Sequence, residues 1–255
     1  MSSIRWLAFY GEIADDVAFD GYQIVILDRG YRGSITKIGA GGARVCSYLS
    51  LCEIRTGDPL FYALHASALL EPNPDWPGTR RVDVRHSSWR SFILDTVIPS
   101  IEAAGFDGLM LDTLDTATYL ESTDPERYRG MRAAAIALVD TIRDQHPHMT
   151  VIMNRGYDLL ADLAPRIDAV IVESLLTVPD GQGHFVLADP DAVARERALL
   201  APAARRRPPL PILSLDYWDP GDRKMIAELY RRERAFGHHP YVATRLLDSI
   251  VPEPS

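Results

Sequence analysis

The chain has little of what several large enzyme classes depend on. It contains two cysteines and seven histidines, and no histidine falls in a His-Glu-x-x-His pattern or at the end of a predicted strand. The sequence therefore argues against a histidine zinc site and a Ser-His-Asp triad. A Gly-x-x-x-x-Gly-Lys motif is also missing, which argues against a nucleotide-binding loop. We expect no built-in cofactor and no metal.

Long apolar runs and excess positive charge are also lacking. No stretch reaches the roughly 18 apolar residues of a membrane span, and the N-terminal apolar run is too short for a signal peptide. With a net charge of −8, the chain has too little excess positive charge for a basic, nucleic-acid-binding face. The charge better suits a neutral or cationic substrate. A complete chain is expected to be cytoplasmic, whereas an excised domain without its signal peptide would be periplasmic or secreted.

The two cysteines, Cys46 and Cys52, lie in one apolar segment. If that segment is extended, about 3.3 Å per residue places them roughly 20 Å apart. This distance is too long for a disulfide, so we expect two free thiols.

Short apolar runs bounded by turn residues recur along the whole chain. Most do not alternate with polar residues, which indicates that both faces are covered, as in parallel strands between helices. The runs predict eight strands, at residues 5–10, 23–28, 43–50, 108–112, 150–154, 169–173, 211–216 and 241–244.

Helical segments separate many of these strands, the clearest at residues 87–105, 124–145, 189–204 and 219–237. Three of them begin with Asp-Pro, which suits an N-cap followed by a proline in the first turn. Eight strands with interleaved helices in about 250 residues predict one (β/α)₈ barrel domain over residues 1–255. Its last helix must be short or missing, and residues 55–88 form a long, mostly irregular loop after strand 3. A doubly wound open sheet is the alternative.

Polar side chains gather at the C-terminal ends of the predicted strands, which is where such barrels carry their chemistry. A single polar residue at such a place is explained simply by an N-cap or a surface charge. Carboxylates beside apolar runs, however, cost free energy unless they are paired or used. The candidate site residues are Tyr10, Glu12, Asp28, Tyr48, Glu53, Asp112, Asp115, Asn154, Arg155, Glu173, Asp216 and Tyr217.

Many carboxylates and several tyrosines without a cofactor suit hydrolysis of a glycosidic bond by two carboxyl groups. The rings of Tyr10, Tyr48, Tyr217 and Trp218 offer faces for sugar stacking, with core packing as the alternative reading. A divalent-cation site built from Asp28, Asp112 and Asp216 is a second alternative, and implies a metal-dependent hydrolase.

Several segments in a fixed order resemble the endo-α-1,4-polygalactosaminidases, and most closely the hydrolase domain of PelA-type exopolysaccharide proteins. The matching segments are "YLSLCE", "GFDGLMLDTLD", "MNRGYDLL", "AVIVES", "LDYWDP" and "HPYVAT". The resemblance implies a (β/α)₈ barrel in which Asp112 is the nucleophile and Glu173 the general acid/base of a retaining mechanism. It also implies sugar contacts from Glu53, Asp115, Asn154, Arg155, Asp216 and Tyr217.

The implied substrate is an α-1,4-linked, partly deacetylated N-acetylgalactosamine polysaccharide, whose free amines an acidic mouth would attract. One departure from the family pattern is Cys52, where relatives carry glycine before Glu53. A non-catalytic polysaccharide-binding domain of an exopolysaccharide synthesis or export assembly is the main alternative function. The exact polymer, the oligomeric state and the presence of neighbouring domains in the native protein are left open.

Overall fold

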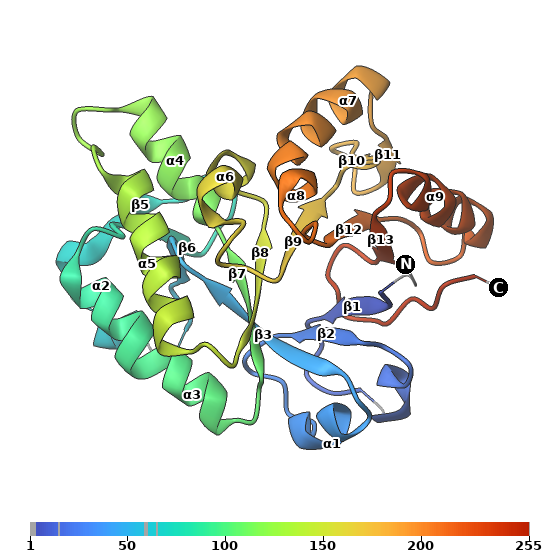
Figure 1. Cartoon of the computed structure of the whole chain (residues 1–255), viewed down its shortest axis with the longest axis horizontal. Coiled ribbons are helices and arrows are strands. Elements are labelled where there is room, and N and C mark those ends of the chain that lie inside the picture. The colour runs from blue at the N-terminus through green and yellow to red at the C-terminus, as the bar shows by residue number, and fades with distance from the viewer. Residues whose placement is uncertain (1–3, 15, 59–60, 65, 255) are drawn as a thin grey trace.

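Eight parallel strands form one sheet that rolls into a nearly closed barrel (Figure 1). The computed structural model describes residues 4–14, 16–58, 61–64 and 66–254. The barrel strands follow one another in chain order: β1 (Trp6–Phe9), β2 (Ile24–Leu27), β3 (Arg44–Ser50), β7 (Gly108–Asp112), β8 (Thr150–Asn154), β9 (Ala169–Glu173), β12 (Ile212–Tyr217) and β13 (His239–Ala243). The predicted (β/α)₈ barrel is confirmed, and each strand lies where an apolar run predicted it.

The seam between β1 and β13 is held by a few contacts instead of a strand ladder. The indole of Trp6 donates to the carbonyl of His239 at 2.7 Å, and its ring lies 5.8 Å from that of Tyr241. Beyond the strands, the backbone N–H of Tyr10 donates to the carbonyl of Leu247 at 2.6 Å. These contacts bring the two ends of the sheet together.

The barrel interior is packed so closely that one position requires glycine. A side chain on Gly108 would place its Cβ 2.5 Å from the sulfur of Cys46 and 2.9 Å from the carbonyl oxygen of Thr150. Cys46 and Cys52 are both buried free thiols, as predicted. Burial raises the pKa of both thiols, so they remain neutral members of the core.

Helices cover the outside of the barrel (Figure 1). The first predicted helical segment is continuous, with α2 (Ser87–Phe92), a π-helical turn (Ile93–Val97) and α3 (Ile98–Ala103) in succession. The last two predicted segments contain α7 (Pro190–Leu199), α8 (Ala201–Arg205) and α9 (Arg223–Ala235). The shorter helices are α1 (Ile35–Ala40) and α6 (Leu160–Leu163), with 3-10 turns at Asp16–Phe19 and Tyr157–Leu159.

Only one of the three Asp-Pro pairs caps a helix as predicted. Asp189 accepts from the N–H groups of the next turn, whereas α9 begins later and is capped by Asp222. The segment predicted as 124–145 is helical only from α5 (Met131–Gln145), because Gly130 takes a left-handed conformation with φ 88°. It follows α4 (Leu114–Thr123), a ten-residue helix that the sequence pattern did not reveal.

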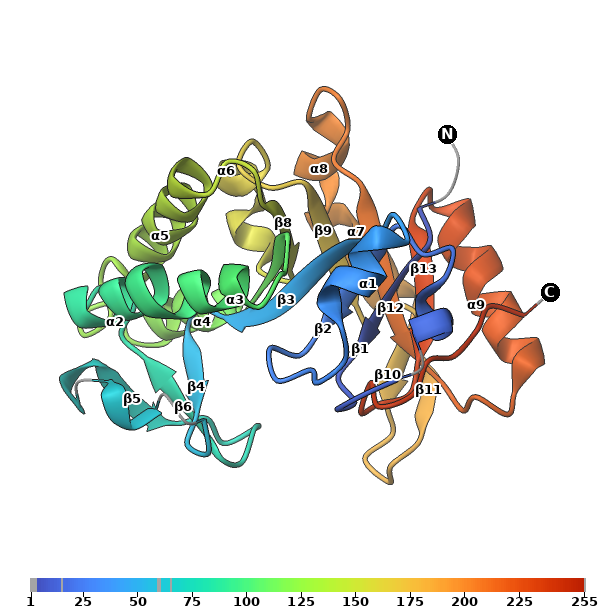
Figure 2. The same ribbon diagram turned by 90° about the horizontal axis from the view of Figure 1, so that it is seen from below.

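Two antiparallel segments project from the same end of the barrel (Figure 2). The loop after β3, predicted to be mostly irregular, contains a sheet of β4 (Glu53–Arg55), β6 (Thr79–Val82) and β5 (Leu69–Pro72), with 3-10 turns at Phe61–Ala63 and Ala66–Ala68. The second segment is the hairpin of β10 (Thr177–Pro179) and β11 (Phe185–Leu187), which follows β9. Through residue 254, no helix follows β13, in agreement with the predicted short or missing last helix.

In the described part of the chain, no helix is both long and apolar enough to cross a membrane.

Candidate active site

The strand register places five predicted residues on one face of the barrel wall. Ser50 pairs with Asp112, Asn154 with Ile171, and Glu173 with Leu215. Because side chains alternate along each strand, these pairings fix which ones share a face. Tyr48, Asp112, Asn154, Glu173 and Tyr217 all point to the inner side, at the C-terminal ends of β3, β7, β8, β9 and β12.

One side-chain amide joins the two central carboxylates. Nδ2 of Asn154 donates to Oδ1 of Asp112 at 3.0 Å and to Oε2 of Glu173 at 2.9 Å. Two oxygens bonded to the same nitrogen cannot be further apart than the two bonds laid end to end, about 5.9 Å. The carboxyl groups of Asp112 and Glu173 therefore form a close pair across the mouth.

Two tyrosines hold the outer oxygens of this pair. The hydroxyl of Tyr48 donates to Oδ2 of Asp112 at 2.9 Å, and the hydroxyl of Tyr217 donates to Oε1 of Glu173 at 2.6 Å. Hydrogen bonds to ionised carboxylates are among the stronger ones in proteins. Each carboxylate is thus fixed by one tyrosine and by the shared amide.

Burial and mutual charge shift the ionisation of this cluster. Burial first, and then the charge of Glu173, raises the pKa of Asp112 to about 6, against the hydrogen bonds from Asn154 and Tyr48. Burial also raises the pKa of Tyr48 and of Tyr217, and the neighbouring carboxylates raise both further. The tyrosines therefore remain neutral donors, while Asp112 changes its charge near pH 6.

Tyr10 lies in the same cluster. Its ring meets that of Tyr48 edge-on at 5.5 Å, and burial, followed by the charges of Asp112, Glu173 and Asp28, raises its pKa. Asp28 folds back onto its own turn, where it accepts from the N–H of residue 30 at 2.7 Å. Tyr10 therefore packs beside the Asp112–Glu173 pair, and the charge of Asp28 acts on Tyr10 from the neighbouring turn.

The residue after each of the three linked side chains has a left-handed backbone. Thr113 follows Asp112 with φ 64°, Arg155 follows Asn154 with φ 54°, and Ser174 follows Glu173 with φ 59°. Such conformations are uncommon for residues other than glycine and cost on the order of 1–3 kcal/mol each. Strain of this kind occurs preferentially at functional sites, and here it lies directly after each of the three linked side chains. The sequence gives no signal for this feature.

Asp115 and Arg155 lie at the rim of the pair. Nε of Arg155 is 3.5 Å from Oδ2 of Asp115, and its Nη1 donates to the carbonyl of Glu173 at 3.4 Å. Asp115 is about half exposed and lies in the first turn of α4. The same two residues border a pocket of about 150 Å³ that also touches Gly156 and Tyr157. The structure thus brings both residues to the mouth as an ion pair.

Glu53 is buried to the side of the mouth, in a separate polar network. Its Oε1 accepts from Nδ2 of Asn73 and from Oγ1 of Thr116, both at 2.8 Å, and its Oε2 accepts from Oγ1 of Thr79 at 3.4 Å. Cys52 occupies the position where the resemblance predicts glycine. It is fully buried, and its N–H donates to Oγ1 of Thr113 at 2.9 Å. Glu53 therefore joins the three-stranded sheet to α4, in a network that sequence patterns do not show.

Glu12 lies apart from the carboxylate pair. Its side chain is 74% exposed and forms an ion pair with Arg32 at 3.2 Å. Of the predicted aromatic faces, Trp218 turns toward α9, where its indole N–H donates to Asp222 at 3.2 Å. An aromatic residue that the sequence did not single out, Phe185 of β11, instead lies on Tyr217 at 5.3 Å.

Asp216 lies on the other side of the barrel wall, because it precedes the inward-facing Tyr217 by one residue. It is buried and accepts from the N–H groups of Leu176 and Thr177, at 2.9 and 3.0 Å, and from the hydroxyl of Thr177 at 3.0 Å. Burial, and then the charge of Glu233, raises the pKa of Asp216 to about 8. The structure therefore does not bring Asp216 to the mouth.

The alternative metal site needed Asp28, Asp112 and Asp216 to converge. The outward orientation of Asp216 separates it from the other two. Across residues 4–14, 16–58, 61–64 and 66–254, no group of three or more histidine, cysteine, aspartate or glutamate side chains could hold a metal ion. The geometry therefore does not support a metal site built from these three residues.

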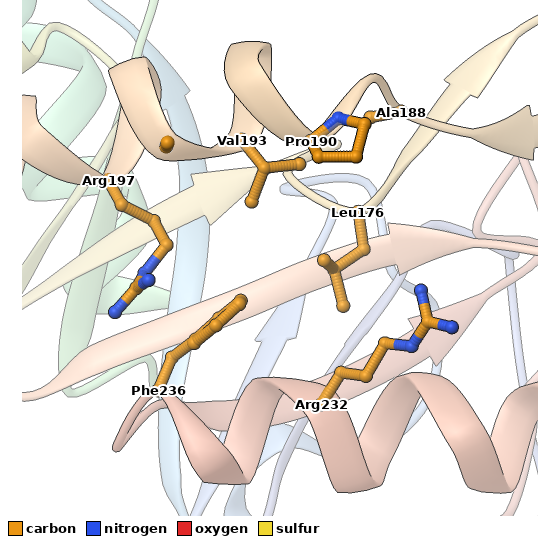
Figure 3. Close-up of a pocket in the computed structure, with 8 residues that line it drawn as sticks. Leu176, Ala188, Pro190, Val193, Arg197, Arg232 and Phe236 are labelled. Carbon is orange, nitrogen blue, oxygen red and sulfur yellow. The ribbon is translucent and has the colours of Figure 1, made fainter.

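A second, larger pocket lies outside the barrel, between α7 and α9 (Figure 3). It has a volume of about 240 Å³, and its lining is mostly apolar. Arg197 and Arg232 border it, and the guanidinium of Arg197 lies 3.7 Å from the ring centre of Phe236. None of the predicted site residues lines this pocket.

One family model matches nearly the whole chain. The model of glycoside-hydrolase family GH114 matches residues 5–254. An uncharacterised protein of Deinococcus radiodurans is 30% identical over 191 residues, which are 72% of this chain and 57% of that protein. The chain thus spans little more than half the length of this relative.

Solved structures share the fold at lower identity. The glycoside hydrolase domain of PelA from Pseudomonas aeruginosa superposes with a TM-score of 0.87 at 24% identity, over 99% of both chains. Aspergillus fumigatus Ega3, in a complex with galactosamine, gives a TM-score of 0.72 at 16% identity, over 99% of this chain and 96% of that one. Both likenesses show the barrel fold.

Proposed function

The chain belongs to glycoside hydrolase family GH114, and from this we propose that it cleaves α-1,4-linked, partly deacetylated N-acetylgalactosamine polysaccharides internally. The similar Ega3 structure was obtained with galactosamine, which supports this sugar as the unit recognised. The family assignment favours an enzyme over the alternative of a non-catalytic binding domain. We further propose that residues 1–255 form one catalytic domain.

The observation that carries the proposal is the shared amide of Asn154. It limits the nearest oxygens of Asp112 and Glu173 to a separation of about 5.9 Å. Retaining glycosidases place their carboxyl groups about 5–5.5 Å apart, whereas inverting enzymes need roughly 6.5–9.5 Å to admit a water. The close pair therefore supports a retaining mechanism.

In this mechanism, the carboxylate of Asp112 attacks the anomeric carbon while the glycosidic oxygen takes a proton from Glu173 and leaves. The resulting glycosyl ester on Asp112 is then hydrolysed by water, which gives a proton to Glu173 as it attacks the same carbon. Tyr48 and Tyr217 keep each carboxyl group oriented through both steps. The pair returns to its starting state, and the product keeps the anomeric configuration of the substrate.

The charges at the mouth suit a polymer with free amines. Asp112, Glu173 and Asp28 lie close enough to Tyr10 that their charges raise its pKa, against the smaller opposing effect of Arg55. The nearby Arg155 is matched by Asp115. A site with an excess of carboxylates attracts ammonium groups over its surroundings. We therefore propose that deacetylated stretches bind more readily than fully acetylated ones.

Reducing-end release tests the proposed substrate. The protein should release new reducing ends from a partly deacetylated α-1,4-galactosamine polymer and yield oligosaccharides, with much less release from β-linked glucosamine polymers. A chelator should leave the rate unchanged. Binding of the polymer without any release of reducing ends would instead establish a binding domain, and preferential cleavage of another hexosamine polymer would overturn the substrate assignment.

Azide rescue tests the two roles separately, because a raised pKa at Asp112 is also what a general acid needs. With an activated aryl α-galactosaminide, Glu173→Ala should give a glycosyl azide of retained configuration, and Asp112→Gly one of inverted configuration. The reverse result would exchange the roles of Asp112 and Glu173.

A further inference from the structure

The polymer proposed above must extend beyond the carboxylate pair, so exposed side chains on the connections between the barrel strands are candidates to contact it. The connections that follow β1, β3, β9 and β13 each expose a large apolar residue, respectively Ile13, Trp76, Val186 and Leu246. Trp76 is the largest of these, and it is 65% exposed. Trp76 thus offers an aromatic face to solvent on the connection that follows β3.

Trp76 lies on a turn that is rigid despite its exposure. The N–H of Trp76 donates to the carbonyl of Asn73, and its own carbonyl accepts from the N–H and the hydroxyl of Thr79, at 3.1 and 2.8 Å. Oδ1 of Asn73 accepts from the N–H of Asp75 at 3.0 Å. The indole is therefore presented by a preorganised turn, which lowers the entropy cost of binding.

This turn is joined through Glu53 to the helix that follows Asp112. Asn73, at one end of the turn, donates to the buried Glu53 carboxylate at 2.8 Å, and Oγ1 of Thr79, at the other end, lies 3.4 Å from the same carboxylate. The same carboxylate accepts from Thr116, in the first turn of the helix that begins just after Asp112. Trp76 is three residues beyond Asn73, or at most about 10 Å of chain. The ring is thus carried by the insertion that Glu53 joins to the helix after Asp112.

We propose that Trp76 forms a distal sugar-binding subsite, in which a galactosamine ring further along the polymer stacks on the indole. Aromatic faces suit sugar rings because the C–H groups of the ring meet the negative face of the π system. The neighbouring Asp75 is exposed and adds a charge that suits a free amine. Glu53 and Asn73 position the ring through the turn.

The inference rests on the proposed function, because the occupant is the same polymer. Its test compares kcat/KM on a long galactosamine polymer with kcat/KM on a short aryl α-galactosaminide. For Trp76→Ala, the ratio of polymer to short-substrate kcat/KM should fall about tenfold, as for one lost stacking contact. Trp76→Phe should recover most of the loss.

The matched control is Tyr62→Ala, since Tyr62 is also an exposed aromatic residue of the same insertion and packs edge-on against Phe61 at 5.5 Å. We expect this variant to keep the wild-type ratio. Equal losses in Tyr62→Ala and Trp76→Ala would overturn the assignment of the subsite to Trp76. An unchanged ratio in Trp76→Ala would also overturn it.

A double-mutant cycle tests the positioning role. Asn73→Ala should lower the polymer-to-short-substrate ratio less than Trp76→Ala, and the double variant should match Trp76→Ala alone. Multiplicative losses would show that the turn does not act through the ring. If the wild-type protein released no reducing ends from the polymer, the proposed function would be wrong. If the wild type were active and Trp76→Ala kept the same ratio, only the subsite assignment would be wrong.

Discussion

The barrel wall carries two sets of neighbouring carboxyl groups, one on each side. Asp112 and Glu173 face inward at the mouth, where an amide and two tyrosines donate to them. Asp216 faces outward toward Glu233 of α9, and each of these two residues is only 1% exposed. Both sets are desolvated, but only the inner one lies at the barrel mouth.

The difference lies in what each set of carboxyl groups binds. The inner carboxylates receive side-chain donors that hold two charges close together without closing off the mouth. Asp216 instead accepts from the backbone at the start of the β10–β11 hairpin, and Glu233 pairs with His238 at 2.6 Å. A raised pKa thus accompanies the proposed catalytic pair in the first case and backbone anchoring in the second.

The largest expected difference between the two sets is in activity. Asp112→Asn and Glu173→Gln should each lower kcat on the galactosamine polymer by about 10³-fold or more, because each removes a group that reacts. Asp216→Asn keeps an acceptor oxygen for the hairpin and should lose less than about tenfold. Initial rates of reducing-end release, with thermal unfolding to confirm the fold, measure all three. Comparable losses of activity in all three variants would contradict the distinction between the inner and outer carboxyl groups.

Removal of the shared amide should shift the pH dependence. The acid limb of kcat/KM in the wild type is expected near pH 6, since the nucleophile is ionised only above the pKa of Asp112. The hydrogen bond from Asn154 lowers that pKa. Asn154→Ala should therefore move the acid limb to higher pH and reduce the maximum rate by about 10- to 100-fold. A limb that stays in place or moves to lower pH contradicts this account.

The outer carboxyl should affect stability instead. Because the folded pKa of Asp216 is raised to about 8, its contribution to stability is full below the unfolded pKa, near 4, and is lost as the pH rises through 8. Asp216→Asn removes this loss. As the pH rises from 4 to 8, the free energy of unfolding of the variant should therefore increase relative to that of wild type by on the order of a few kcal/mol.

Denaturant unfolding at both pH values measures this gain, and Asp216→Ala is the control. Alanine leaves the N–H groups of Leu176 and Thr177 without an acceptor, so it should lose about 2 kcal/mol or more at either pH. If Asp216→Asn followed the same pH dependence as wild type, Asp216 would not be the group that titrates.

A small effect is expected where the backbone bends beside the inner pair. Ser174→Gly relieves a left-handed conformation and should raise the free energy of unfolding by up to about 1 kcal/mol. The freer backbone next to Glu173 should lower kcat a few-fold. Urea unfolding and initial rates on the same preparation check both effects. Lower stability in this variant would show that the conformation carries no strain.

The strands and the polar residues at their ends were predictable from sequence for a physical reason, whereas the pairing of Asp112 with Glu173 came only from the family resemblance. Runs such as 108–112 and 169–173 are buried on both faces, so they are apolar throughout, and the polar residue that ends each run marks the mouth. The placement of Asp216 was not predictable in the same way. It and Tyr217 are adjacent, and only the register decides which one faces inward.

The remaining misses share a cause in long-range contacts. Glu53 bonds to residues 20 to 63 positions away, so no local pattern reveals its network. The β4–β6–β5 sheet likewise depends on pairing between short segments within a polar insertion. α4 was missed because its boundaries are set by the turn after Asp112 and not by a strong apolar stripe.

The anomeric configuration of the first product tests the central claim, that Asp112 and Glu173 act as a close retaining pair, most directly. Proton NMR of the reducing-end signals in the first minutes of cleavage of an α-1,4-galactosamine oligomer distinguishes the two outcomes before mutarotation mixes the anomers. The account predicts that the α anomer appears first and the β anomer follows. Initial appearance of the β anomer would show inversion and contradict it.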